Sequence, residues 1–236
     1  WARVPLVGRL IYGGIRMTVQ LILVGFYLQV VFDLDSPWLN AVWLLVMILV
    51  ADVSILRATG LRFRKLAGPV FVALLAGISV PLLYFVGIIL HRPNLLEARY
   101  VIPIGGMILG NCLRADIIGV RKFYHSIRYG QKAYRQTLAD GATLAEATRP
   151  YLRDALHEGL APTLATMATI GLVSLPGMMT GVILGGENPR TAVMYQIVIM
   201  ITIFSGTSIT ILLAVLLCRK TGFKANGLLN PEIFKE

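Results

Sequence analysis

The 236-residue chain is 56% hydrophobic and only 14% charged, and its mean hydropathy is +0.73. A soluble core cannot hide so much apolar surface, so the composition predicts an integral membrane protein. The formal net charge of +10 raises the possibility of nucleic-acid binding. The basic residues, however, fall between the apolar runs, where they act as topology signals, so nucleic acid is not an expected partner.

Six segments are long and apolar enough to cross a bilayer as helices. They cover about residues 10–32, 38–56, 69–90, 100–120, 162–184 and 192–218. Residues 1–16 overlap the first of them and are expected to begin as a short interfacial elbow. The third segment contains Gly77 and Pro81, which are expected to break its helix. The pattern predicts an all-α, polytopic helical bundle that forms a single membrane domain over residues 1–236.

The basic residues also predict the orientation of this bundle. All 22 Lys and Arg residues except Arg92, Arg99 and Arg190 fall on one side of the six segments. Cytoplasmic loops carry the excess of positive charge, so both ends of the chain are expected to face the cytoplasm. The expected location is the plasma membrane, which is the inner membrane of a bacterium.

The fifth segment contains the least ordinary stretch of the chain, from Gly171 to Arg190. Pro176, Gly177 and Gly181 interrupt it, and such residues open a helix and free its backbone groups. Lipid tolerates an opened backbone only where it lines a cavity or is buried in protein. The sequence therefore predicts a hinge or a pathway at this position.

Several side chains near the break are candidates for lining that pathway. Their thioether, hydroxyl and amide groups belong to Met107, Asn111, Met178, Met179, Thr180 and Gln196. Thioethers favour Cu(I) and are mediocre ligands for Fe(II), so the methionines fit adaptable packing better than iron binding. The polar side chains fit either a pathway or hydrogen bonds between helices.

Besides Arg16 near the start of the first segment, three charged residues lie within the apolar segments. Asp52 is near one end of the second segment, and Arg114 and Asp116 are near the same side of the fourth. Charges in a membrane usually pair, so an Asp52–Arg114 ion pair is favoured over a cation relay.

Residues 121–161 form the one long polar stretch between segments. A helix is expected from Arg121 to Leu138, followed by a turn at Gly141. Thr143 and Glu146 have the spacing of a capping box that opens a very short helix, which Pro150 then stops. Such a capped element can transmit force from a soluble partner, and its contact residues would be Gly141, Ala142, Thr143 and Glu146. The alternative is a solvated connecting loop.

Asp154, His157 and Glu158 share one helical face at i, i+3 and i+4. This spacing can bind a divalent metal, although exposed carboxylates with one His are more often simply solvated. The His residues of the chain, His91, His125 and His157, are far apart in sequence, so the residues offer no catalytic cluster for an enzyme.

Four motifs resemble those of the FetB-like permease family, the membrane subunits of ABC transporters linked to bacterial iron export and plant aluminium tolerance. The longest is V-S-L-P-G-M-M-T-G at 173–181, followed by L-G-G-E-N-P and A-V-M-Y-Q-I. The others are V-I-P-I-G-G-M-I-L-G-N at 101–111, L-A-D-G-A-T at 138–143 and V-Q-L-I-L-V-G at 19–25. The resemblance covers essentially the whole chain. Family members usually have one further span, so an additional N-terminal span is expected outside this chain.

The resemblance implies that residues 1–236 form the permease domain of an ABC transporter that exports a metal ion, with iron as the first candidate. The implied partners are an ABC ATPase subunit, a second copy of this chain and the lipid bilayer. The chain contains no G-x-x-x-x-G-K-[ST] phosphate-binding loop, so ATP and Mg are expected in the ATPase, and no cofactor is expected in this chain. The alternatives are another substrate, the importing direction, or a structural membrane subunit.

Overall fold

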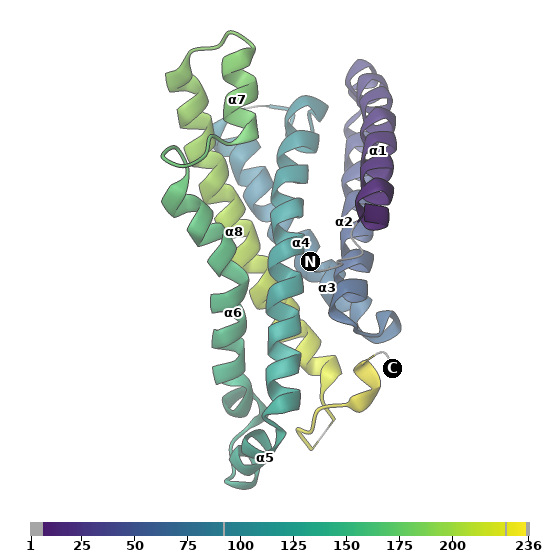
Figure 1. Cartoon of the computed structure of the whole chain (residues 1–236), viewed down its shortest axis with the longest axis vertical. Coiled ribbons are helices and arrows are strands. Elements are labelled where there is room, and N and C mark those ends of the chain that lie inside the picture. Colours follow the sequence, from purple (N-terminus) through teal and green to yellow (C-terminus); the bar gives the residue numbers. More distant parts are fainter. Residues whose placement is uncertain (1–6, 92, 225, 235–236) are drawn as a thin grey trace.

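The computed structural model describes residues 7–91, 93–224 and 226–234. Over these residues the chain is helical and contains no strand, which confirms the predicted all-α class (Figure 1). The α-helices are α1 (Val7–Leu34), α2 (Pro37–Thr59), α3 (Phe63–Tyr84), α4 (Ala98–Tyr129), α5 (Gln131–Ala139), α6 (Leu144–Thr169), α7 (Gly177–Leu184) and α8 (Pro189–Gly222). A π-helical turn, Phe85–Ile89, extends α3, and a short 3-10 helix, Pro231–Ile233, lies near the C-terminal end.

Five stretches of these helices are long and apolar enough to cross a membrane, one fewer than the sequence predicts. They lie in α1, α2, α3 with its π-helical turn, α4 and α8. The predicted segment 162–184 is not one helix, because residues 170–176 separate the end of α6 from α7. Figure 1 shows α6 and α7 following one another along α8, so together they take the place of the missing span.

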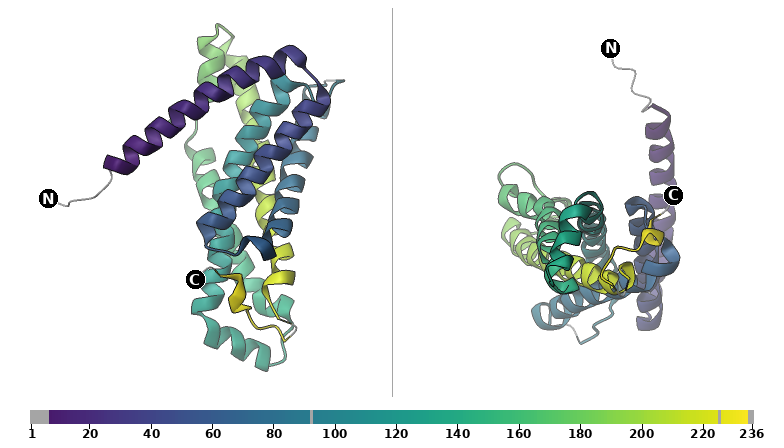
Figure 2. Two further views of the ribbon diagram at one scale, coloured as in Figure 1. Left: turned by 90° about the vertical axis from the view of Figure 1, so that its right-hand side faces the viewer. Right: turned by 90° about the horizontal axis from the view of Figure 1, so that it is seen from below.

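Helix α8 lies at the centre of the bundle and packs against α3, α4, α6 and α7, while α2 packs against α3 and α4. Helix α1 is different, since it runs obliquely away from the other helices (Figure 2) and only 6% of its apolar window is buried. The predicted elbow is wrong for residues 7–16, which belong to the continuous helix α1. Residues 1–6 lie outside the described part of the chain.

The predicted break at Gly77 and Pro81 is also wrong, because α3 runs through both residues. The irregularity lies one turn further on, where the N–H of Leu90 donates to the Phe85 carbonyl in the wider π-helical pattern. Gly77 has a packing role instead. A Cβ placed there would lie 2.3 Å from Thr210 Cγ2, so α3 and α8 approach each other closely at this point.

The polar stretch between the fourth and fifth predicted spans folds into three helical pieces. Helix α4 continues to Tyr129, α5 follows, and α6 runs unbroken through Pro150 and Pro162. The prediction that Pro150 stops a very short helix is therefore wrong. Proline removes one backbone hydrogen bond, and at Pro150 the carbonyl that loses its partner belongs to the exposed residue Glu146, which water can reach.

Candidate functional site

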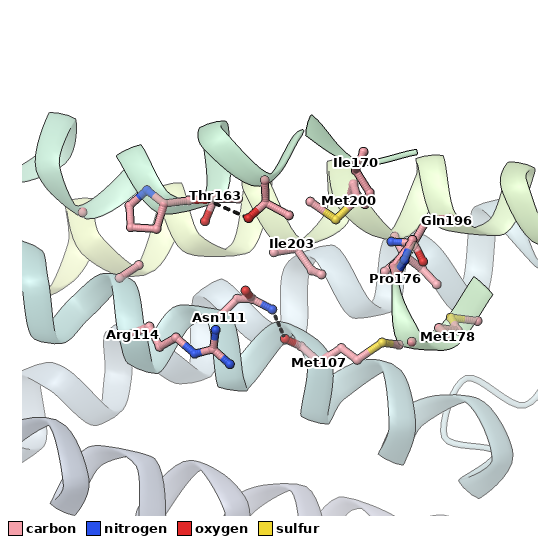
Figure 3. A pocket seen from close by; sticks show the side chains of 16 residues that line it. Met107, Asn111, Arg114, Thr163, Ile170, Pro176, Met178, Gln196, Met200 and Ile203 are labelled. Atoms are coloured by element: carbon pink, nitrogen blue, oxygen red, sulfur yellow. Dashed lines mark hydrogen bonds between the residues drawn. The ribbon is translucent and has the colours of Figure 1, made fainter. Parts of the chain in front are cut away.

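A cavity of about 230 Å³ lies between α4, α6, α7 and α8, beside the break that separates α6 from α7 (Figure 3). Sixteen residues line it, and they include most of the pathway residues predicted from the sequence. These are Met107, Asn111, Pro176, Gly177, Met178 and Gln196, and Arg114, which was expected to pair with Asp52, lines the cavity as well. The fold thus brings together residues that are up to 89 positions apart in the chain.

The α4 wall of the cavity follows one face of the helix. Met107, Asn111 and Arg114 are four and three residues apart, so their side chains lie on the same side of α4. The side-chain amide of Asn111 donates to the carbonyl of Met107 over 2.8 Å. In Figure 3 the Arg114 guanidinium lies beneath Asn111 on this wall. From Met107 to Ala115 the lined stretch is roughly 12 Å long at 1.5 Å per residue.

The break itself forms the second wall. Helix α6 ends at Thr169, and Gly171 adopts the left-handed conformation with φ +85°. Its N–H donates to the Ser174 carbonyl over 2.9 Å, which closes a small turn. Pro176 then precedes α7, and no side chain caps that helix. The predicted helix opening is therefore present, but a left-handed glycine begins it several residues before the Pro176–Gly177 pair.

Helix α8 supplies the third wall through Gln196, Ile199, Met200 and Ile203. The Gln196 side chain is only 8% exposed, and its Oε1 atom has no hydrogen-bond partner within the described residues. Buried amide oxygens normally have a partner, so the fold leaves a polar group unsatisfied beside the cavity.

The floor of the cavity is closed by close contact between α4, α6 and α8. A Cβ on Gly159 would lie 2.7 Å from Ile211 Cδ1 and 3.0 Å from the Ala115 carbonyl oxygen. A Cβ on Gly119 would lie 2.9 Å from Ile211 Cγ2 and 3.2 Å from the Ala155 carbonyl oxygen. We call this contact the closed floor, and it lies between the cavity and the end of the bundle that carries α5.

Residues 1–223 match the family model of UPF0014, described as an uncharacterised protein family. The chain belongs to the UPF0014 family. A UPF0014 membrane protein of Synechocystis is 36% identical over 203 residues, which cover 86% of this chain and 78% of the relative. The Arabidopsis thaliana protein ALUMINUM SENSITIVE 3 is 32% identical, over 96% of this chain and 82% of the relative.

An Escherichia coli relative carries the name "Probable iron export permease protein FetB". It is 31% identical over 200 residues, which cover 84% of this chain and 75% of the relative. No solved structure matches the chain. These relatives agree with the resemblance to the FetB-like family that the sequence motifs indicate.

The rest of the break motif lies outside the cavity. Met179 lines a second, more apolar hollow of about 500 Å³ on the other side of Pro176 and Gln196. The Thr180 hydroxyl donates to the Pro176 carbonyl over 3.1 Å, as a helical Thr often does, and Gly181 has open space at its Cβ position. Met178 therefore faces the cavity, whereas its neighbour Met179 faces away from it.

The predicted Asp52–Arg114 ion pair does not form among the described residues. Arg114 and Asp116 are two residues apart on α4 and so point to nearly opposite sides of the helix. Arg114 lines the cavity, whereas Asp116 is fully buried on the other side. Neither Asp116 oxygen makes a hydrogen bond of normal geometry within the described residues, although the Thr210 hydroxyl lies near it.

Asp52 is 1% exposed, and its Oδ1 atom also lacks a partner within the described part of the chain. Buried carboxyl groups without partners destabilise a fold, so the interior around α2, α4 and α8 contains two costly groups. They lie outside the cavity.

Asp154, His157 and Glu158 are not assembled into a metal site. Among the described residues no group of three His, Cys, Asp or Glu side chains is placed to hold a metal ion. Glu158 forms an ion pair with Lys122 of α4, while Asp154 and His157 lie on the surface of α6. The i, i+3 and i+4 spacing on α6 is present, but one of the three side chains, Glu158, is paired with Lys122 of α4.

The predicted coupling residues lie at the α5 end of the bundle, far along α6 from the break. Gly141 has φ +94° in the turn after α5, and Ala142 follows it. The capping box is complete, since Glu146 accepts hydrogen bonds from the Thr143 N–H over 2.8 Å and the Thr143 hydroxyl over 2.7 Å. These bonds lower the pKa of Glu146, because they stabilise its ionised form.

Sequence reasoning missed several cavity residues, notably Thr163, Thr166 and Met200. Met200 lies four residues after Gln196 and therefore on the same face of α8, so its place in the cavity could have been predicted from this spacing. Nothing in the sequence marked which face of α6 would meet α4.

Proposed function

We propose that this chain is the membrane subunit of an ABC transporter that exports a metal ion, with iron as the first candidate, driven by a separate ATPase subunit. The observation that carries the proposal is the cavity at the broken helix. It lies inside a membrane bundle, it has a closed floor, and one of its walls is the interrupted backbone typical of transport pathways.

Helix α6 supports a mechanism for coupling. It begins at the capping box beside α5 and ends at the break, so a displacement at its first turn acts on the cavity wall through one continuous helix. The 26 residues of α6 correspond to roughly 39 Å at 1.5 Å per residue. An ATPase that grips Gly141, Ala142, Thr143 and Glu146 would therefore move the cavity wall, while ATP and Mg remain in that partner.

A second copy of this chain would complete the membrane unit. Leu172 and Val173 in the break are 90% and 81% exposed, and irregular backbone does not face lipid in a bilayer. A partner copy packed over residues 170–176 would cover them. The expected location is the plasma membrane, with both chain ends on the cytoplasmic side, as the distribution of Lys and Arg indicates.

The test is reconstitution. The chain is purified from the cells that produce it naturally, and any ATP-hydrolysing subunit that purifies with it is identified. The chain and that subunit are then reconstituted together in vesicles loaded with different metal ions. We expect a bound ATPase and ATP-dependent flux of iron. Absence of any nucleotide-binding partner, or unchanged function after Glu146→Ala, would overturn the transporter proposal, whereas indifference to iron would overturn only the choice of metal.

A further inference from the structure

The charge that lines the cavity is positive only. Arg114 is the one charged residue among the sixteen that line it, and no carboxylate faces the cavity. Within the described residues Arg114 forms no ion pair and no hydrogen bond. Arginine keeps its charge in proteins, and Arg114 is exposed where it lines the cavity. The guanidinium is therefore available to an oxyanion.

The start of α7 adds to this positive character. Pro176, Gly177 and Met178 line the cavity, so the first turn of α7 lies against it. No side chain caps this helix end, which leaves backbone N–H groups without an intrahelical partner. A helix N-terminus carries partial positive charge, and in broken membrane helices such ends face anionic groups of substrates. Two independent elements, α4 and α7, thus favour negative charge in one cavity.

A bare divalent cation has the opposite requirement. Hard cations prefer oxygen ligands with negative charge, and this cavity offers amide, hydroxyl and thioether groups beside a guanidinium. A metal dication and the Arg114 guanidinium carry charges of the same sign, so they repel each other. A metal bound to a carboxylate or phosphate ligand avoids this repulsion, because the complex can carry zero or negative net charge.

Building on the proposed function, we propose that the cavity binds its cargo through a carboxylate or phosphate group that pairs with Arg114. A metal then enters it as a complex with such an oxyanion and not as a bare cation. The volume of about 230 Å³ corresponds to roughly seven or eight waters, enough for a small organic acid or phosphate. Gln196 also lines the cavity, and its buried, unpaired Oε1 atom would accept a hydrogen bond from a hydroxyl or water of that ligand once the amide turns toward it.

The experiment measures equilibrium binding to the full chain in lipid nanodiscs. The probes are radiolabelled citrate, inorganic phosphate, ferric citrate, Fe(II) under reducing conditions and Cu(I). Arg114→Gln removes the charge, Arg114→Lys retains it without the bidentate geometry, and Arg114→Glu reverses it. Arg121→Gln is the matched control, because Arg121 lies two turns further along α4 and does not line the cavity.

We expect the wild-type chain to bind at least one oxyanion probe, and Arg114→Gln to weaken that binding at least about tenfold. Arg121→Gln should bind the oxyanion probe as the wild type does, and Arg114→Lys should retain part of that binding. Arg114→Glu should bind Fe(II) instead of the oxyanion. Comparison of citrate with phosphate identifies the source of the oxyanion. Equal binding by wild type and Arg114→Gln, no oxyanion binding at all, or preference of the wild type for Fe(II) or Cu(I) alone would overturn the inference. Co-purification with an ATPase is measured separately, so a failure of the transporter proposal can be told apart from a failure of the oxyanion inference.

Discussion

The two ends of the cavity differ in how closely their backbones pack. At the closed floor, glycines let the backbones approach so closely that a Cβ on Gly159 would lie 2.7 Å from Ile211. Further along, α6 ends at Thr169, and a Cβ added at Gly177 or Gly181 would have no neighbouring atom within 4 Å. One region is packed to the limit that glycine allows, and the other has room to rearrange.

This difference indicates where motion can occur. A tightly packed contact has few alternative arrangements, whereas a segment with few packed neighbours and an interrupted backbone opens at low cost. We infer that the break rearranges more readily than the closed floor. Substitutions that add side-chain volume should therefore destabilise the fold strongly at the closed floor and only mildly in the break.

The largest effect is expected at the floor. Gly159→Leu forces a side chain against Ile211 and the Ala115 carbonyl, and this should lower the free energy of unfolding by about 3 kcal/mol. The measurement is thermal unfolding and the yield of monodisperse protein in detergent. Gly110→Leu on α4 is the control, because no atom lies within 4 Å of its Cβ position. Equal behaviour of the two variants would contradict the closed floor.

A smaller effect is expected in the break, and it should differ between two glycines. Gly171→Ala places a side chain on a left-handed residue with φ +85° and should cost about 1–2 kcal/mol. Gly177→Ala lies at the start of α7 in helical backbone and should be neutral or stabilise by up to about 1 kcal/mol. Paired thermal melts measure the difference. If Gly177→Ala were the more damaging variant, the Pro176–Gly177 pair and not Gly171 would determine the break.

The smallest effect is expected at the far end of α6. Thr143→Ala removes the cap and should cost about 1 kcal/mol. The cap also predicts a pH dependence. Because the folded-state pKa of Glu146 lies below its ordinary value of 4.5, its contribution is present above that value and is lost as the pH falls through the lowered pKa.

Melts of wild type and Glu146→Gln between pH 7 and pH 3 check the cap, since their difference in stability should shrink at acid pH. A difference that stayed constant down to the lowest pH would show that the Glu146 carboxylate does not act through its charge.

Much of this architecture could be predicted from local sequence. Apolar run lengths indicated α1, α2, α3, α4 and α8, and the spacing of Thr143 and Glu146 indicated the capping box, because both signals act within a few residues. The break was also predictable, since Pro176 and nearby glycines interrupt an apolar run. Its starting point at Gly171 was not, because glycine adopts left-handed and helical backbone almost equally well.

The errors share a physical cause, which is that tertiary packing decides between local alternatives. Pro150 and Pro81 lie inside continuous helices, although proline usually ends them. Arg114 was expected to pair with Asp52, since the sequence does not show which face of α4 meets which neighbour. The rotation of α4 directs Arg114 to the cavity and Asp116 to the interior, and this placement carries the inference about an anionic ligand.

The most direct test of the account is ATP-driven transport by a chain whose break has been made helical. Gly171→Ala combined with Pro176→Ala favours a continuous helix from α6 into α7. In inside-out vesicles containing the chain and the proposed ATPase subunit, with iron supplied as a citrate complex, we predict that transport falls at least about tenfold while the ATPase subunit remains bound. Transport at the wild-type rate by this variant would contradict the claim that the break is the part that rearranges.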